Sequence, residues 1–293
     1  MRTHWKVAAL ALAASALAAC QPVQMTAPSQ AAQPVAVRFA IQAGDAPVTC
    51  TQGAEGLGVA GSPAQFNDLR FYVSNVALIT AAGEAVPVAL EQDGLWQSGS
   101  TALLDFEDGT AGCADSGTPD MNDVVSGAVA PGAYTGIQFD LGVPFASNHQ
   151  DVTLAPSPLN SSPMWWNWQG GYKFVRIDMT TDAPDGGAWF IHLGSTGCMA
   201  ADQATAPAAP CARPNLAGVR LDGFDPATNL IVADMATLLA AVDLSQSTPM
   251  PPGCMSGADD PDCAFLLPAF GLEIETGQCS EAGCPAQTFF RVQ

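Results

Sequence analysis

The stretch "VAVRFAIQ", residues 35–42, decides the fold class, because apolar side chains recur in it at every second position. Val35, Val37, Phe39 and Ile41 alternate with small or polar residues. A period of two places the apolar side chains on one face of a β-strand and the intervening ones on the other. The stretch therefore predicts a strand with one buried face.

The same signal recurs along the chain. Residues 69–79, "LRFYVSNVALI", predict a strand with a bend near Asn75, and residues 134–143, "YTGIQFDLGV", alternate again. Further short strands are expected in "YKFVRIDMT", "WFIHLG", "AGVRLDGF", "NLIVAD" and "TFFRV", and the chain's 28 glycines and 23 prolines fall largely between such runs. We predict an all-β fold, a disulfide-stapled β-sandwich or barrel with long loops and at most one or two short helices. The one helix that the pattern favours covers residues 235–242, with Asp234 as its N-cap.

The N-terminal residues have the features of a secretory signal. Arg2 and Lys6 precede a short run of Ala and Leu, and residues 17–20, "LAAC", resemble a bacterial lipobox. This predicts a signal peptide at residues 1–19, cleavage before Cys20, and lipidation of that cysteine. The expected location is periplasmic or cell-surface, lipid-anchored to the outer membrane of a Gram-negative bacterium.

Residues 20–35 follow as the lipidated cysteine and a flexible tether rich in Pro, Gln and Ala, and residues 36–293 form one β domain. Without its signal the chain keeps seven basic and 28 acidic residues, so the net charge moves from −19 to −21. Such a surface repels nucleic acid and anionic lipid headgroups. We therefore expect no nucleic-acid partner, and contact with a membrane only through the N-terminal lipid.

Eight cysteines follow Cys20, and an even number in an exported protein indicates disulfides. Sequence alone does not choose among the many possible pairings. Proximity along the chain favours Cys198–Cys211, Cys254–Cys263 and Cys279–Cys284, which leaves Cys50–Cys113.

Metal ligands are scarce in the exported chain, which has only two histidines, His149 and His192. A single histidine is more often a structural hydrogen-bonding group than a ligand, and a third donor is needed. Met164 is a candidate, because imidazole together with a thioether suits copper, Cu(I) above all. No P-loop and no dinucleotide fingerprint is present, so neither a nucleotide nor a haem of its own is expected. The acidic loops near residues 114–123 and 256–263 do not have EF-hand spacing and are expected to be solvated.

Residues 164–174, "MWWNWQGGYKF", hold three of the six tryptophans in four positions. In an extended run Met164, Trp166 and Trp168 share one face. Aromatic clusters are usually core, so residue types alone favour a buried strand here. The two following glycines leave room for another backbone or a partner to come close.

Seven separate blocks of the sequence, in this order, resemble the MbnP-like family, also called the metallo-mystery-pair four-Cys-motif proteins. They are "LLDFEDGTAGC", "GAYTGIQFDLGVPF", "NH" at 148–149, "PLN" at 158–160, "MWWNWQGGYKF", "FIHLGSTGC" and "GCMSGADDPDC". The resemblance covers nearly all of residues 36–293. It implies that the four family cysteines are Cys198, Cys211, Cys254 and Cys263.

The resemblance also implies a function. Family members are exported partners of a MauG-like di-haem cytochrome c peroxidase, which oxidises a tryptophan to kynurenine, and the product binds copper together with histidine. The family motif M-x-W-x-W falls on Met164, Trp166 and Trp168, and we favour Trp166 as the oxidised residue. Kynurenine offers an aromatic amine and a ketone, whereas the indole N–H is only a donor. The expected protein is a copper-handling lipoprotein and not an enzyme.

Two other classes of function stay open from the residues alone. A carbohydrate- or protein-binding β-sandwich would stack Trp165, Trp166 and Trp168 on its ligand and would need no metal. A hydrolase would need a nucleophile or carboxylate pair near His149 or His192, and the sequence marks none.

Overall fold

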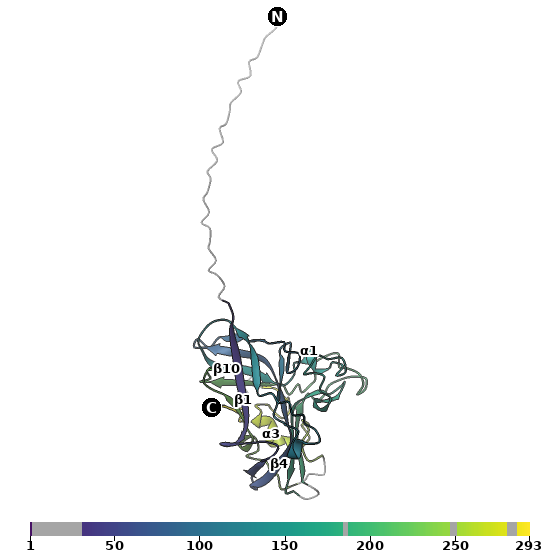
Figure 1. The fold of residues 1–293 in the computed structure, drawn as a ribbon. Helices are drawn as coiled ribbons and strands as arrows, with labels where there is room; N and C mark the ends of the chain where they lie inside the picture. Colours follow the sequence, from purple (N-terminus) through teal and green to yellow (C-terminus); the bar gives the residue numbers. More distant parts are fainter. Residues whose placement is uncertain (2–30, 184–186, 247–250, 280–285) are drawn as a thin grey trace. The chain divides into compact units, whose positions relative to one another are not determined.

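One long strand, β4 (Ser62–Thr80), organises the larger of two sheets in the computed structural model, which describes residues 1, 31–183, 187–246, 251–279 and 286–293 (Figure 1). The main path through this sheet is β14-β10-β4-β12-β13-β16. Its members besides β4 are β14 (Ala217–Asp222), β10 (Tyr134–Leu141), β12 (Gly171–Thr181), β13 (Ala188–Gly194) and β16 (Gly253–Cys254). Shorter strands join this path, namely β3 (Ala54–Leu57), β5 (Ala85–Pro87), β7 (Gln97–Ser98), β8 (Thr101–Asp105) and β11 (Trp165–Asn167).

The smaller sheet is built on β1 (Gln33–Ala43), and the order along it is β17-β15-β1-β9-β6. Its other members are β17 (Phe290–Val292), β15 (Ile231–Asp234), β9 (Val124–Val129), β6 (Ala89–Leu90) and β2 (Ala46–Pro47). β1 pairs in parallel with β15 and antiparallel with β9. The alternating stretch at residues 35–42 thus forms a strand, as predicted.

The two sheets share one apolar core. Phe39 of β1 packs edge-on against Phe71 of β4, with ring centroids 6.3 Å apart, and against Phe139 of β10 at 5.8 Å. Phe290 of β17 completes this cluster at 5.2 Å from Phe139. The predicted all-β fold is confirmed, and of the two architectures left open by the sequence it is the sandwich.

The bend predicted in β4 is present at Asn75, whose φ is 52°. This left-handed conformation strains most side chains, but Asn tolerates it. Register shifts in the pairing with β10 lie close by, between Gln138 and Asp140. β12 pairs with β4 from Ala64 to Phe71, and β10 pairs with it from Val73 to Thr80, on both sides of the bend.

Two expectations need correction. β1 begins at Gln33 and pairs with β9 from there, so residues 33–35 belong to the sheet and not to the tether. Pro34 fits because its neighbours still form the ladder, and a strand can accept a proline near its first residue. The described chain also has three α-helices, one more than expected: α1 (Phe145–Asn148), α2 (Met235–Leu238) and α3 (Cys263–Ala269).

α2 has the predicted cap, since the Asp234 side chain accepts hydrogen bonds from the backbone N–H groups of Ala236 and Thr237. Two 3-10 turns complete the set, η1 (Ala111–Cys113) and η2 (Ser162–Met164). None of the described helices is long and apolar enough to span a bilayer.

Three of the four predicted disulfides are present: Cys50–Cys113, Cys198–Cys211 and Cys254–Cys263. The fourth pairing stays a prediction, because Cys284 lies outside the described residues. The signal peptide, Cys20 and most of the tether lie outside them as well. Cys254–Cys263 joins β16, at the edge of β13, to the start of α3.

Candidate metal centre

The tryptophan segment forms η2, β11 and a turn that leads back into β12. Trp165 pairs with Tyr172, while Gly171, with φ of 75°, makes the turn. A Cβ at Gly171 would collide with the carbonyl oxygen of Asn148, so this close approach requires glycine. Met164 is fully buried within the core.

The side chain of Trp166 is half-buried and packs against two glycines, Gly170 and Gly194. A Cβ added at Gly194 would lie 2.5 Å from Cζ3 of the indole, and one at Gly170 would lie 3.4 Å from Cε3. Both glycines therefore contact the six-membered ring of Trp166.

A cavity of about 450 Å³ opens beside Trp166. Its walls come from the tryptophan turn, from the chain that follows β13 and from the residue after β16, and its lining includes Trp166, Gln169, Ser195, Cys198 and Met255. Trp165 and Trp168 are absent from this lining. Trp166 is thus the tryptophan of the segment with an open space next to its ring.

His192 lies on β13, on the face of the sheet that points away from the core. Trp189, Ile191 and Leu193 are buried in the core, and His192 and Gly194 alternate with them on the opposite face. Two residues of a strand span roughly 7 Å, so the indole over Gly194 and the imidazole of His192 are neighbours on one face. His192 thus lies on the same face of β13 as Gly194, two positions from the residue against which the ring of Trp166 packs.

Asp178 of β12 holds the His192 ring in place. Nε2 of His192 lies 2.6 Å from Oδ1 of Asp178, so that nitrogen carries the proton and donates it to the carboxylate. Burial alone would raise the pKa of Asp178, but the bonds and charges of His192 and Arg176 lower it. The arrangement leaves Nδ1 of His192 as the nitrogen with a lone pair, as in carboxylate–histidine–metal sites.

A line of buried charges continues from this pair across β12 and β4. Arg176 contacts Asp178 at 2.7 Å and Asp68 at 3.0 Å. Arg70 pairs with Asp68 in turn and reaches Glu107 at 2.8 Å. Asp68 and Glu107 are at most 1% exposed, so each depends on these guanidinium groups for compensation.

Glu107 should make the folded protein less stable as the pH rises. Burial raises its pKa from 4.5 to about 8, with the charge of Asp68 acting in the same direction and Arg70 against it. The unfolded chain then binds fewer protons than the folded one between these values, so stability falls as the pH increases. Between pH 6.5 and 8 we expect a loss of about 1–2 kcal/mol in urea unfolding. Glu107→Gln should remove most of this slope, and an unchanged slope would contradict the assignment.

His149 follows α1 and is anchored on the tryptophan segment from another direction. Its Nδ1 lies 3.1 Å from the backbone oxygen of Trp168, to which it donates a hydrogen bond. Nε2 is then the acceptor, and the side-chain amide of Asn148 lies 3.2 Å away. Burial lowers the pKa of His149, which keeps the ring neutral, although the bond to Trp168 acts in the other direction.

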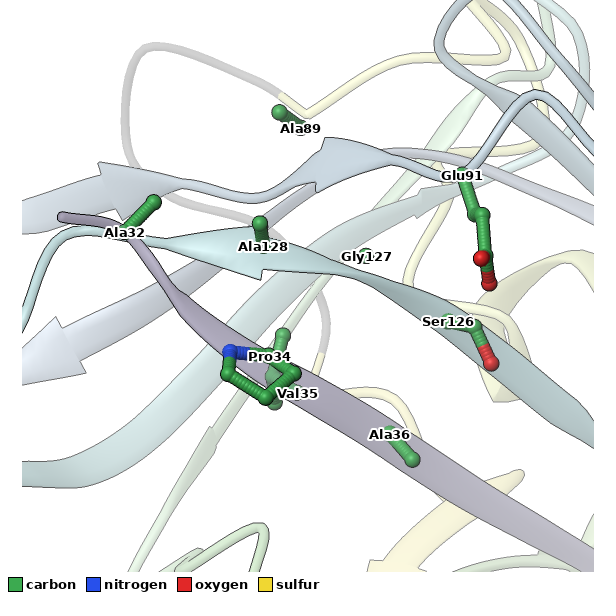
Figure 2. Close-up of a pocket in the computed structure, with 9 residues that line it drawn as sticks. All are labelled: Ala32, Pro34, Val35, Ala36, Ala89, Glu91, Ser126, Gly127 and Ala128. Atoms are coloured by element: carbon green, nitrogen blue, oxygen red, sulfur yellow. The ribbon is translucent and has the colours of Figure 1, made fainter.

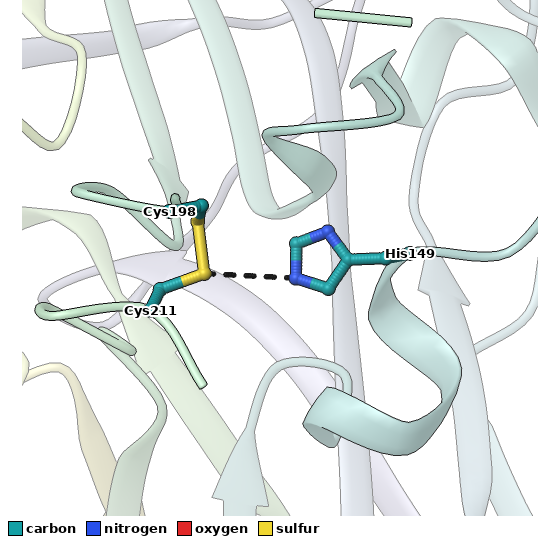
Figure 3. A group of neighbouring side chains, drawn as sticks. All are labelled: His149, Cys198 and Cys211. Atoms are coloured by element: carbon teal, nitrogen blue, oxygen red, sulfur yellow. Dashed lines mark hydrogen bonds between the residues drawn. A yellow bond between two sulfur atoms is a disulfide. The ribbon is translucent and has the colours of Figure 1, made fainter. Parts of the chain in front are cut away.

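The Cys198–Cys211 disulfide lies directly against this imidazole (Figure 3). Sγ of Cys211 is 3.6 Å from Nε2 of His149. Among the described residues, these form the one set of three or more His, Cys, Asp or Glu side chains whose ligand atoms all lie within 4.8 Å of one another. While the sulfurs are bonded to each other, neither is a thiolate, and the group is a packing contact.

The structure therefore brings both predicted histidines to the tryptophan segment, but at different places. His149 binds the carbonyl of Trp168. His192 shares a face of β13 with Gly194, against which the ring of Trp166 packs. No hydrogen bond or ring contact among the described residues joins the two imidazoles. Trp168 packs edge-on against Trp165, with centroids 6.0 Å apart.

Sequence reasoning missed the residues that orient these side chains, Asp178 and Asn148. Asp178 stands in the alternating stretch at residues 172–180, where its outward position on the strand was visible. Nothing in the sequence showed that it would face His192, because that contact depends on the pairing of β12 with β13.

A second cavity, of about 620 Å³, lies against β1, β6 and β9 (Figure 2). Small side chains line most of it, and Glu91 is the single titratable residue among them. This cavity does not offer the converging polar groups of a reactive site.

Comparisons with known proteins agree with the resemblance seen in the sequence. The family model MbnP matches residues 32–256. Among solved structures, MbnP from Methylosinus trichosporium matches with a TM-score of 0.79 and 36% sequence identity, over 89% of this chain and 98% of that one. No curated protein matches. The family match includes the tryptophan segment, and the chain belongs to the MbnP family.

Proposed function

We propose that the protein is an exported copper-binding lipoprotein in which Trp166 is oxidised to kynurenine and then binds copper together with His192. The solved relative is named MbnP, and we infer a role in copper binding from membership of that family. The chain itself catalyses no reaction in this proposal. It is the substrate of a di-haem cytochrome c peroxidase and afterwards a carrier of copper, with Cu(I) preferred.

The feature that supports this best is the anchored imidazole of His192, which lies two residues along one face of β13 from Gly194, where the ring of Trp166 packs. Nε2 of His192 is hydrogen-bonded to Asp178 at 2.6 Å, which leaves Nδ1 of the same ring available to a metal. Gly194 lies two residues further along the same face of the strand, and the indole of Trp166 packs against it. A nitrogen donor and an oxidisable ring therefore share one surface.

The position of the indole suits the oxidation. The step consumes two equivalents of hydrogen peroxide, each of which delivers one oxygen atom and leaves as water. The Cγ–Cδ1 bond breaks, Cγ and Cδ1 each receive one oxygen, and hydrolysis by a further water releases Cδ1 as formate. The benzene ring survives, and this is the part that rests on Gly170 and Gly194. The pyrrole edge becomes a ketone and an aromatic amine, both with lone pairs.

Met164 is left out of this ligand set, because it is fully buried in the core. His149 is left out as well, because its Nδ1 is bound to the carbonyl of Trp168 and its Nε2 faces the Cys211 sulfur, 3.6 Å away. Electron removal from Trp166 can take place from a distance, and Trp168 and Trp165 in edge-on contact offer a route to it.

The experiment is an intact-mass measurement on protein produced with and without the peroxidase. Oxidation of Trp to kynurenine adds about 4 Da, and tandem mass spectrometry should place the change on residue 166. As long as the disulfides are intact, copper uptake should appear only in the oxidised form. An unchanged mass together with no uptake would remove the proposal and favour a sandwich that binds carbohydrate or protein through unmodified tryptophans.

Gly194→Ala should lower the yield of kynurenine, because the new methyl group would meet Cζ3 of Trp166 at 2.5 Å and the Tyr172 carbonyl oxygen at 2.7 Å. Overpacking of this kind costs about 1–3 kcal/mol and moves the ring. Conversion per hour, followed by mass, measures the effect. The matched control is Gly218→Ala on β14, where the nearest atom is 3.8 Å away, and it should convert like the wild type.

A further inference from the structure

We propose that Cys198, Cys211 and His149 become a second copper(I) site when their disulfide is reduced. This site is separate from the one on β13, shares no ligand with it, and does not depend on oxidation of Trp166. The three ligand atoms are already close together, but the disulfide keeps both sulfurs from binding a metal. Reduction by a dithiol frees them as thiolates.

The first support is geometric. Nε2 of His149 lies 3.6 Å from Sγ of Cys211, and all three ligand atoms lie within 4.8 Å of one another. Two ligands on one metal ion, with bonds of about 2.0–2.3 Å and tetrahedral or trigonal angles, are separated by roughly 3.6 Å. The imidazole and the Cys211 sulfur already have this separation, and cleavage of the S–S bond frees Cys198 to move to a third position.

The second support is the orientation of the imidazole. The Trp168 carbonyl accepts the proton on Nδ1 at 3.1 Å, which fixes the tautomer and aims the Nε2 lone pair at the sulfurs. The Asn148 amide also reaches Nε2, but it has a second acceptor, Oγ of Ser195 at 3.2 Å. A metal ion can therefore take the lone pair without leaving that amide unpaired.

The choice of ion follows from the ligands. Two thiolates and one neutral imidazole are soft donors, which suit Cu(I) much better than calcium or magnesium. His149, Cys198 and Cys211 are each at most 9% exposed, so the ion would be shielded from water. The other disulfides in the described chain have no imidazole within this range.

A reductant can reach the disulfide from the cavity beside Trp166, because Cys198 lines that cavity. The thiolate of a dithiol attacks Sγ of Cys198, and the S–S bond breaks with its electron pair going to Cys211. The second thiolate of the reductant then releases Cys198 and closes the reductant's own disulfide. Two electrons pass to the protein, and two thiolates face His149.

The test uses full-length domain made without the peroxidase, in a His192→Ala background that removes the first site. After reduction with a phosphine or dithiol, Cu(I) is titrated in competition with a coloured chelator. We expect one more equivalent of Cu(I) bound after reduction than before. X-ray absorption should show both sulfur and nitrogen scatterers around the copper.

Two variants decide the matter. Cys198→Ser with Cys211→Ser keeps the other reduced thiols and should lose this equivalent. His149→Gln keeps all thiols and should weaken binding by about 10–100-fold, with loss of the imidazole scattering. Circular dichroism of each reduced variant checks that the sheets are intact. Absence of uptake after reduction, or uptake that is the same in His149→Gln, would overturn the proposal.

Discussion

Replacing His192 by alanine should lower the affinity of the kynurenine-bearing protein for copper by at least about 100-fold. Nδ1 of this ring is the protein nitrogen that Asp178 leaves free on the face carrying Trp166. Without it, the kynurenine amine and ketone have no imidazole partner there. Competition with a Cu(I) chelator measures the affinity, and intact mass confirms that oxidation at residue 166 is unchanged.

Two further variants test the orientation of this site. Asp178→Asn removes the carboxylate that fixes the ring and should weaken copper binding by about 10-fold, with partial recovery in Asp178→Glu. His149→Gln, in protein whose disulfides are intact, should leave the affinity unchanged. Equal losses from His149 and His192 variants would show that both imidazoles hold one ion, contrary to the separation described above.

Replacing Arg70 by methionine should destabilise the fold by about 3–5 kcal/mol. Arg70 contacts Asp68 and, at 2.8 Å, Glu107, and both carboxylates are buried. The variant removes the guanidinium from between these two groups. Asp68 keeps only Arg176, and Glu107, whose raised pKa already leaves it mostly protonated at neutral pH, loses its contact with the guanidinium. The free energy of unfolding in urea at neutral pH measures the loss.

The control is Arg220→Met. Arg220 also pairs with an aspartate, Asp222 at 3.3 Å, but its side chain is 48% exposed and that of Asp222 81%. A surface pair of this kind contributes about 0–1 kcal/mol. Similar losses in both variants would show that the buried line of charges is not what makes Arg70 important.

The fold was largely predictable, because alternation of apolar and polar residues indicates a strand with one buried face. Residues 35–42 and 134–143 alternate and form β1 and β10, and Asn75 marks the bend in β4. The start of β1 was less visible, since Gln33 and Pro34 have a composition typical of a tether yet pair with β9. Tertiary pairing overrides local composition at such boundaries.

The site was predictable by residue type and not by arrangement. Spacing along the chain does not indicate which partner each imidazole binds, and residue type alone assigns the same role to His149 and His192. In the fold, one is bound to a backbone carbonyl of the tryptophan turn, and the other to Asp178 across a strand pair. The contact between Cys211 and His149 joins residues 62 positions apart, a separation that local patterns do not reach.

The bend of β4 at Asn75 also bears on how this family can diverge. One strand supplies edges to β12, β8 and β10, so deleting a single residue from it would turn every later side chain to the other face. The loop at residues 199–210 has no such obligation, because it lies outside every strand. Natural insertions and deletions should therefore accumulate in that loop, while the length of β4 stays constant from one species to the next.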